Sequence, residues 1–437
     1  MTASSGEVLT AAPLTDSELV AIRSDFPLLS RRALTGQPLV YLDSAATSQR
    51  PRIVQDAMRD FTDNHNGAVH RGAHALAEEA TDAFEQARAA VAQFVGAGAG
   101  EMVFTSGTTA GINLLTTSWA AASRGAGSGA ARRFAVLPGD RIVVTQAEHH
   151  ANLVPWQQLA AATGAELAWV RVDREGRLRL EDLEDVVTAR TRVVAFTHAS
   201  NVSGAVTDVA AMVAAAKEAG ALTVLDAAQT APHRALDLAA LDVDFAVFSA
   251  HKMLGPTGIG ALYGRADLLE AMPPGPTGGS MVEIVTMSEA TFQPPPSRFE
   301  AGTQAVTQTV GWAAAIDYLT HLGMDRLAAH EAALTARLLD NVGEISGVRI
   351  LGPAHPSNRL GAVAVEVDGV HPHDVGQFLD AQGIAVRVGH HCAQPIHRAL
   401  GVNASTRASV AVYNTTAEVD RFAEALDQVR AYFGAAL

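Results

Sequence analysis

The segment Phe245–Gly260, FAVFSAHKMLGPTGIG, decides the fold of this chain more than any other stretch. It begins with an apolar run, Phe245–Ser249, that is typical of a buried strand, and it continues into a turn rich in Gly and Pro. In open α/β sheets, ligands bind beyond the carboxyl ends of the strands. Lys252 is therefore expected where a ligand would bind, with Ser249 and His251 beside it.

Six further apolar strands are predicted on either side of this segment, separated by helical patterns. Helix-like stretches include Thr108–Ala122, Asn152–Ala162, Leu180–Val187 and Val209–Ala219. The alternation predicts an α/β fold in which a large domain, residues 41–320, holds a seven-stranded, mostly parallel sheet. The six strands are Met102–Phe104, Arg141–Thr145, Glu166–Val172, Arg192–Thr197, Leu222–Asp226 and Gly258–Tyr263.

The pattern changes from about Thr303 onward. Two long helical segments precede two strands and two further helices: Gln304–Leu322, Asp325–Ile345, Arg349–Leu351, Gly361–Val367, His373–Gln382 and Glu418–Phe433. This predicts a smaller α+β domain at residues 321–437, completed by residues 1–40, which fold back onto it. Within the large domain, Arg124–Ala131 (RGAGSGAA) is predicted to be a surface loop insertion away from the motifs.

The composition excludes several classes of protein. The 437 residues carry a net charge of −14, and an acidic chain without a basic cluster is not expected to bind nucleic acid or an anionic membrane. No stretch approaches the ~20 uncharged apolar residues of a spanning helix, and Met1–Leu14 lacks the pattern of a signal peptide. One cysteine cannot form an internal disulfide. We therefore expect a cytoplasmic enzyme.

Lysine is scarce in this chain. The 32 basic residues comprise 30 arginines and two lysines, Lys217 and Lys252. A position that keeps Lys is a candidate for a primary amine, because guanidinium stays protonated and cannot form an imine. Lys217 lies near the end of an Ala-rich helix, which is an ordinary place for a cation. Lys252 is therefore the candidate, with a lysine that snorkels from a strand end as the structural alternative.

Asp226 closes the apolar strand LTVLD, and Gln229 follows one helical turn later. A carboxylate there can keep a pyridine nitrogen protonated, which a pyridoxal ring needs when it stores electrons. A helix N-cap is the alternative role for Asp226. Together, Asp226 and Lys252 would supply complementary halves of one pyridoxal phosphate site from neighbouring strand ends.

Two more runs could complete such a site. In FTSGTTAGIN, a strand leads through Gly into a helix that starts near Thr108, where hydroxyls and free N–H groups suit a phosphate, although ordinary capping is the alternative. Ser249 and His251 can donate to the same phosphate. The run lacks the Gly-Lys-Ser/Thr of a nucleotide-binding loop. In EHHANLVPW, His149 or His150 could stack on a flat ring or carry a proton, or have a structural role.

The run Arg387–Pro395, RVGHHCAQP, contains the only cysteine, Cys392. A metal site is one interpretation, but the contiguous His and Cys side chains point apart in an extended loop and make poor co-ligands, so no metal is predicted. A reactive thiol, whose thiolate is favoured by nearby His or Arg, is the second interpretation, and a buried inert cysteine is the third. Arg407 opens an apolar strand and could clamp a carboxylate or form a surface ion pair.

Taken together, these runs resemble the class V aminotransferase family, and within it the SufS-type (group II) cysteine desulfurases. The match covers nearly the whole chain in ten ordered segments: YLDSAATSQRP, VHRGAH, SGTTAGIN, EHHANLVPW, SNVSG, DAAQ, FSAHKMLGPTGIG, RFEAGT, RVGHHCAQP and RAS. RxGHHC is typical of group II. The resemblance implies a homodimer of fold type I that binds pyridoxal 5'-phosphate. Two positions depart from the family pattern: Gln304 replaces a usual proline, and Ser203 replaces a larger apolar residue.

The resemblance also implies roles for the matching residues. Lys252 would hold the cofactor covalently, Cys392 would be the nucleophile that accepts sulfur, and His149 would stack on the ring and move protons. Cofactor contacts are implied for Thr108, His149, Asp226, Gln229, Ser249, His251, Lys252 and, from the second subunit, Thr303. On the substrate side, Asn201 and Arg407 would bind the carboxylate, and Arg387, His70 and Arg71 would line the site.

The implied reaction converts L-cysteine to L-alanine, and the sulfur is held as a persulfide on Cys392 for transfer to a sulfur-acceptor protein of iron–sulfur cluster assembly. A selenocysteine lyase of the same family is the alternative enzyme. A non-catalytic scaffold in a sulfur-assembly complex is an alternative from another class. An aminotransferase is disfavoured because nothing in its reaction requires RxGHHC.

Overall fold

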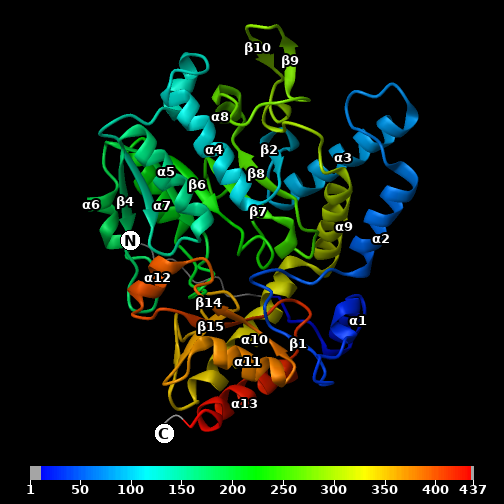
Figure 1. Cartoon of the computed structure of the whole chain (residues 1–437), viewed down its shortest axis with the longest axis vertical. Helices are drawn as coiled ribbons and strands as arrows, with labels where there is room; N and C mark the ends of the chain where they lie inside the picture. Colours follow the sequence, from blue (N-terminus) through cyan, green and yellow to red (C-terminus); the bar gives the residue numbers. More distant parts are fainter. Residues whose placement is uncertain (1–10, 435–437) are drawn as a thin grey trace.

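A seven-stranded sheet forms the centre of the larger part of the molecule (Figure 1), in a computed structural model that describes residues 11–434. All seven predicted strands are present. Their order is β2 (Met102–Thr105), β8 (Gly260–Gly264), β7 (Phe245–Ser249), β6 (Leu222–Asp226), β5 (Thr191–Thr197), β3 (Arg141–Thr145) and β4 (Glu166–Val170). β8 runs antiparallel to both of its neighbours, whereas the other pairings are parallel, so the sheet is mostly parallel as predicted.

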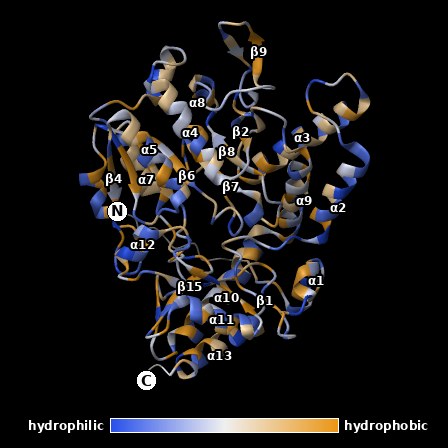
Figure 2. Ribbon diagram, in the orientation of Figure 1, coloured by the Kyte–Doolittle hydropathy of each residue, from blue (hydrophilic) through white to orange (hydrophobic). Residues whose placement is uncertain are grey.

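Helices cover both faces of this sheet, and each face has its own apolar core. On one face, α3 (Ala75–Phe94), α7 (Val209–Glu218) and α9 (Val306–Leu322) contribute to one cluster. On the other, α4 (Thr108–Ser123) and α5 (Val154–Thr163) contribute Trp119 and Trp156. Every residue of β6, β7 and β8 is buried, which explains why these strands are continuous apolar runs rather than alternating ones. The outer helices, by contrast, carry both hydrophobic and hydrophilic residues (Figure 2).

A smaller α+β unit lies below the large sheet in Figure 1. Its antiparallel sheet has the order β11 (Val348–Ile350), β12 (Ala362–Val367), β15 (Ser405–Ser409) and β14 (Arg387–Gly389). Helices α10 (Met324–Gly343), α11 (Pro372–Ala381) and α13 (Thr416–Tyr432) share one apolar cluster with it. β14 was not predicted, because it is only three residues long and is immediately followed by the polar His-His-Cys run.

The N-terminal segment packs against this smaller unit. β1 (Val40–Tyr41) pairs in parallel with β13 (Ile384–Ala385), and Arg23 of α1 (Asp16–Ser24) forms a 2.9 Å ion pair with Glu418. The division into residues 41–320 and residues 321–437 joined by 1–40 stays a prediction, and residues 1–10 lie outside the described part. Within residues 11–434, no helix is long and apolar enough to cross a membrane.

Candidate active site

One cavity, of about 410 Å³, lies at the carboxyl ends of β5, β6 and β7 and reaches the strands of the smaller sheet. Side chains from both parts of the molecule line it. They include eleven of the fourteen residues that the sequence predicts for the site: Thr108, His149, Asn201, Asp226, Gln229, Ser249, His251, Lys252, Arg387, Cys392 and Arg407. The structure therefore brings together most of the residues predicted to contact the cofactor and the substrate, together with the cysteine.

The Lys252 amine and the Asp226 carboxylate line this cavity and attract each other electrostatically. Lys252 ends the short turn η7 (Ala250–Lys252) directly after β7, and Asp226 is the last residue of the adjacent strand β6. Burial lowers the pKa of Lys252 to about 8, with Asp226 opposing and Arg407 adding to the shift. Burial also raises the pKa of Asp226, whose Oδ1 accepts a hydrogen bond from the Ala228 N–H at 3.0 Å. A buried carboxylate of this kind is stabilised by a cationic partner such as a protonated pyridine nitrogen.

The start of α4 forms a cradle for an anion. The Thr108 N–H and the Thr108 hydroxyl each lie 2.8 Å from the Ser249 hydroxyl. Gly107 precedes them at φ 146, and a Cβ there would lie 3.3 Å from the same oxygen, so a side chain would fill the cradle. Because the first N–H groups of a helix have no partner within it, this corner fits a phosphate. This corner fits the phosphate of pyridoxal 5'-phosphate, and the Lys252 amine and the Asp226 carboxylate fit its aldehyde and its ring nitrogen.

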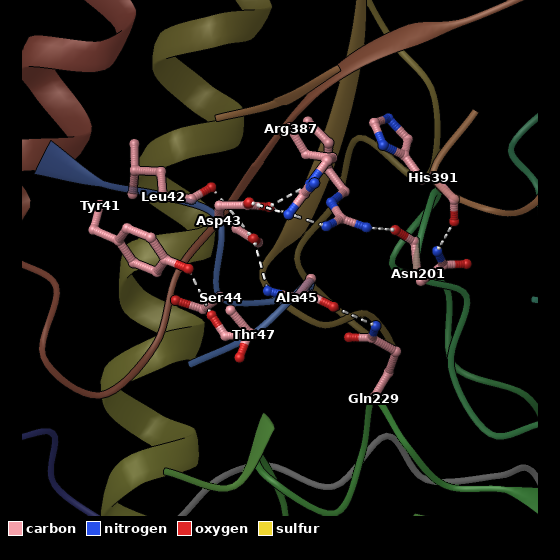
Figure 3. A network of polar contacts seen from close by, with 12 residues as sticks. Tyr41, Leu42, Asp43, Ser44, Ala45, Thr47, Asn201, Gln229, Arg387 and His391 are labelled. Carbon is pink, nitrogen blue, oxygen red and sulfur yellow. Dashed lines mark hydrogen bonds and ion pairs between the residues drawn. The ribbon is translucent and has the colours of Figure 1, made fainter. Parts of the chain in front are cut away.

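His149 presents a neutral imidazole to the cavity. Its Nδ1 accepts from the Ala151 N–H at 3.1 Å, which leaves the ring proton on Nε2. Burial, with Lys252 as a second cause, lowers the pKa of His149 to about 4. Gln229, which lines the same cavity, donates from Nε2 to the Ala45 carbonyl at 3.0 Å (Figure 3). A flat neutral ring and a fixed amide are suited to hold and orient a planar cofactor.

Two arginines meet at the Asp43 carboxylate (Figure 3). Arg387 donates to Asp43 Oδ2 at 2.7 Å, and Arg407 donates to Oδ1 at 3.4 Å. Arg407 is buried, and it also donates to the Asn201 carbonyl at 2.9 Å. Burial lowers the pKa of Arg407 to about 10, so the guanidinium stays charged at neutral pH. Two positive charges against one negative charge leave a net positive corner that fits a carboxylate.

Cys392 lies in the loop between β14 and α12 (Gln394–Ala399), and its side chain is exposed. His391 and Cys392 both have left-handed backbones, at φ 50 and φ 55. The His150 N–H donates to the Cys392 carbonyl at 2.6 Å, and His150 Nε2 accepts from the Gln394 N–H at 3.1 Å. The Asn201 amide donates to the His391 carbonyl at 2.6 Å. The thiol therefore lies on a loop that hydrogen bonds to His150 and Asn201 hold in place.

A chain of hydrogen bonds under this loop fixes the protons of two histidines. The Ala393 carbonyl can only accept, so His397 donates to it from Nδ1 at 2.9 Å, and the Nε2 of the neutral ring is an acceptor. The single proton of the Ser405 hydroxyl therefore points to His397 Nε2 at 2.9 Å, and the same oxygen accepts from His391 Nε2 at 2.8 Å. Burial lowers the pKa of both rings, which keeps them neutral. No group of three His, Cys, Asp or Glu side chains in residues 11–434 is arranged to hold a metal.

Three predicted site residues lie outside this cavity as formed by one chain. Thr303 is exposed, His70 contacts Glu85 at 2.9 Å, and Arg71 donates to the carbonyls of Ser280 and Val282. Their site roles remain predictions.

Sequence reasoning missed Asp43 and left His391 without a role. Asp43 belongs to the quoted segment YLDSAATSQRP, so its signal was a carboxylate in a matched motif. Nothing local indicates its partners, because they lie more than 340 residues away in the chain.

The comparisons with known proteins agree with this geometry. The aminotransferase class-V model matches residues 40–422. The chain belongs to the class-V aminotransferase family. Members of this family, cysteine desulfurases included, depend on pyridoxal 5'-phosphate.

Individual relatives match this class-V chain almost end to end. It is 52% identical to a probable cysteine desulfurase of Mycobacterium leprae, over 96% of this chain and 99% of the relative, and 47% identical to one of Streptomyces coelicolor, over 96% and 99%. Among solved structures, the apo cysteine desulfurase of Thermococcus onnurineus superposes with a TM-score of 0.86 at 37% identity, covering 96% of this chain and 99% of that one. The cysteine desulfurase CsdA of Escherichia coli gives 0.84 at 36% identity, covering 95% and 98%. These neighbours have the fold type I architecture predicted for this chain.

Proposed function

We propose that this protein is a cysteine desulfurase of the SufS (group II) type, which converts L-cysteine to L-alanine and holds the sulfur as a persulfide on Cys392. One observation carries the proposal: the Cys392 thiol lines the same cavity as the Lys252 amine and the paired arginines. An amino acid bound there has its carboxylate, amine and thiol within reach of three different groups. The names of the relatives support the same activity.

Each polar group of the cavity has a task in this reaction. Arg407 and Asn201 bind the substrate carboxylate and orient the amino acid. When bound, pyridoxal phosphate withdraws electrons from Cα and so acidifies its proton. The Lys252 amine, with its lowered pKa, takes a proton from Cα and returns one. His149, held neutral, covers the ring face.

The sulfur transfer itself belongs to Cys392. Its thiolate attacks the sulfur of the substrate, and a new S–S bond forms. The bond between Cβ and sulfur breaks with its electron pair on carbon, which takes up a proton and becomes the methyl group of alanine. No external oxidant is needed, because carbon is reduced as the two sulfur atoms are oxidised to the persulfide level.

The partners follow from this chemistry. We propose that the persulfide sulfur passes to an acceptor protein of iron–sulfur cluster assembly. We also propose that the enzyme is a cytoplasmic homodimer. In this dimer Thr303 reaches the cofactor of the second subunit, and His70 and Arg71 line the site. Support comes from the exposed position of Thr303 away from the cavity of its own chain. A single reactive cysteine also suits a compartment that keeps thiols reduced.

Alanine formation from L-cysteine, with dithiothreitol as thiol acceptor, tests the activity. We expect Cys392→Ala to bind the cofactor and lose alanine and sulfide production, and Lys252→Ala to lose the visible absorbance of the attached cofactor. Undiminished cysteine turnover in Cys392→Ala would rule out the acceptor role.

A further inference from the structure

A second hollow continues outward from the active site. It is a groove of about 610 Å³ between α4 and α5, which lie side by side (Figure 1). Four residues line both the groove and the inner cavity: Thr109, His149, Ala151 and Cys392. The groove therefore begins at the thiol and leads away from it over the surface.

The walls of the groove follow one face of each helix. From α4 come Thr109, Asn113, Thr116, Thr117 and Ala120, and Arg124 follows directly after the helix, where the predicted loop insertion begins. From α5 come Val154, Gln158 and Leu159, and Val154 is 44% exposed. At 1.5 Å per residue, the α4 wall from Thr109 to Arg124 is about 22 Å long. An extended peptide of about seven residues would cover this distance.

The charge of this face differs from that of the rest of the protein. The chain carries 46 acidic residues and a net charge of −14, yet residues 102–139 and 149–165 contain no Asp or Glu. The first of these stretches holds three arginines, and Arg124 is the only Lys, Arg, Asp or Glu side chain that lines the groove. Arg124 is exposed and forms no ion pair within residues 11–434. The groove is thus uncharged along its length and positive at its outer end.

We propose that this groove binds an extended segment of the sulfur-acceptor protein, with the acceptor cysteine at Cys392 and an acidic side chain at Arg124, about seven residues away. The inference rests on the proposed function and adds the surface on which sulfur leaves. The acceptor thiolate attacks the outer sulfur of the Cys392 persulfide. The bond between the two sulfur atoms breaks, Cys392 leaves as a thiolate, and the acceptor carries the persulfide, so no oxidant or reductant is consumed.

Synthetic peptides can test the groove without cysteine turnover. The probe is an eight-residue peptide whose N-terminal cysteine is a mixed disulfide with thionitrobenzoate and whose last residue is Glu or Lys. Attack by the Cys392 thiolate releases coloured thionitrobenzoate, and the chain has no other cysteine to react. The wild-type holoenzyme is expected to react about two to five times faster with the Glu peptide than with the Lys peptide at low salt, the size expected for one exposed ion pair.

Three variants sharpen this test. Arg124→Glu should abolish or reverse the preference, whereas Arg174→Glu, which changes the same charge at an exposed position outside the groove, should keep it. Asn113→Trp should slow both peptides by filling the groove. The small disulfide reagent dithiobis-nitrobenzoate should react equally with all four proteins, which shows that the thiol itself is intact.

Several outcomes would overturn the proposal. Equal rates for the Glu and Lys peptides would do so, as would a preference for the Glu peptide that survives Arg124→Glu or that is also lost in Arg174→Glu. Peptide rates that fall as enzyme concentration rises would do so too, because they would mean that a second copy of the chain occupies the groove. Alanine formation with dithiothreitol in the same preparations distinguishes this failure from failure of the desulfurase activity.

Discussion

Arg387 and Arg407 lie directly opposite each other on the adjacent antiparallel strands β14 and β15. Like charges in this arrangement destabilise a sheet. The pair is tolerated because the Asp43 carboxylate, only 12% exposed, contacts both guanidinium groups. A residue near the start of the chain thus stabilises the pair of arginines that lines this end of the cavity.

Replacing that carboxylate should cost stability. We expect Asp43→Asn to lower the free energy of unfolding by about 2–3 kcal/mol, because Arg407 is left buried beside a like charge. Denaturant unfolding of the holoenzyme measures the loss. The matched control is Asp82→Asn, at an exposed carboxylate, which should change the unfolding free energy by less than about 0.5 kcal/mol. Equal stability of the two variants would contradict the bridging role.

Substrate binding should depend on the shape of the Arg407 side chain as well as its charge. Arg407→Lys keeps the charge but loses the planar fork that reaches both the Asn201 carbonyl and Asp43. The KM for L-cysteine is expected to rise at least about tenfold, while the cofactor remains bound. Steady-state kinetics and cofactor content check this, and an unchanged KM would remove Arg407 from the carboxylate site.

Cofactor attachment should be pH-dependent because of Lys252. Its folded pKa is lowered to about 8, so the neutral amine needed for attachment becomes more common as pH rises through 8. The rate at which apoenzyme binds pyridoxal phosphate should increase about tenfold per pH unit below 8 and level off above it.

The same shift affects the stability of the apoenzyme. Between the folded pKa near 8 and the ordinary value of about 10.4, the unfolded chain binds more protons, so this group makes the stability rise with pH in that window. Lys252→Ala should lose this part of the pH dependence. A wild-type reconstitution rate that does not change with pH from 6 to 9 would argue against a lowered pKa.

The Ser405 hydroxyl should control how tightly the cysteine loop is held. It bonds His391 directly, and it reaches Ala393 through His397, so it restrains the residues on both sides of Cys392. Ser405→Ala leaves two buried ring nitrogens without partners and should cost about 1–3 kcal/mol of stability. We expect faster alkylation of Cys392 by iodoacetamide in this variant and recovery in Ser405→Thr, which keeps the hydroxyl. Unchanged alkylation would show that the loop is held by other contacts.

Glu148, the buried carboxyl that precedes His149 in the chain, should not tolerate replacement by the neutral amide of Gln. Glu148 accepts from the Thr197 N–H at 2.9 Å and from Asn152 Nδ2 at 2.6 Å. The Asn152 amide cannot turn over, because its Oδ1 accepts from Trp156 Nε1 at 3.0 Å. In Glu148→Gln two N–H groups would face each other, so we expect a loss of about 1–3 kcal/mol in thermal or denaturant unfolding. No loss would mean that the Asn152 amide can rearrange.

The sequence predicts the parts of this protein that depend on local pattern. The apolar strands end at Asp226 and Ser249, and because neighbouring parallel strands end at the same edge of the sheet, their pattern alone predicts that Asp226 and Lys252 meet. The relation between Asp43 and the two arginines could not be predicted in this way, since it depends on how two distant segments pair. The direction of the Ser405 proton follows only from the Ala393 carbonyl, which no sequence pattern reveals.

The pairing of β1 with β13 and the contact of Asp43 with Arg387 and Arg407 also set an order of events during protein synthesis. The large sheet, with Lys252 and Asp226, can fold while the chain is still emerging from the ribosome, since domains generally form from the N-terminal side first. Asp43 must then wait until residue 387 has been made before an arginine can neutralise its charge, and until residue 407 for the second arginine. A chain that stops before residue 387 contains Lys252 and Asp226 but leaves the Asp43 carboxylate without either of its arginine partners.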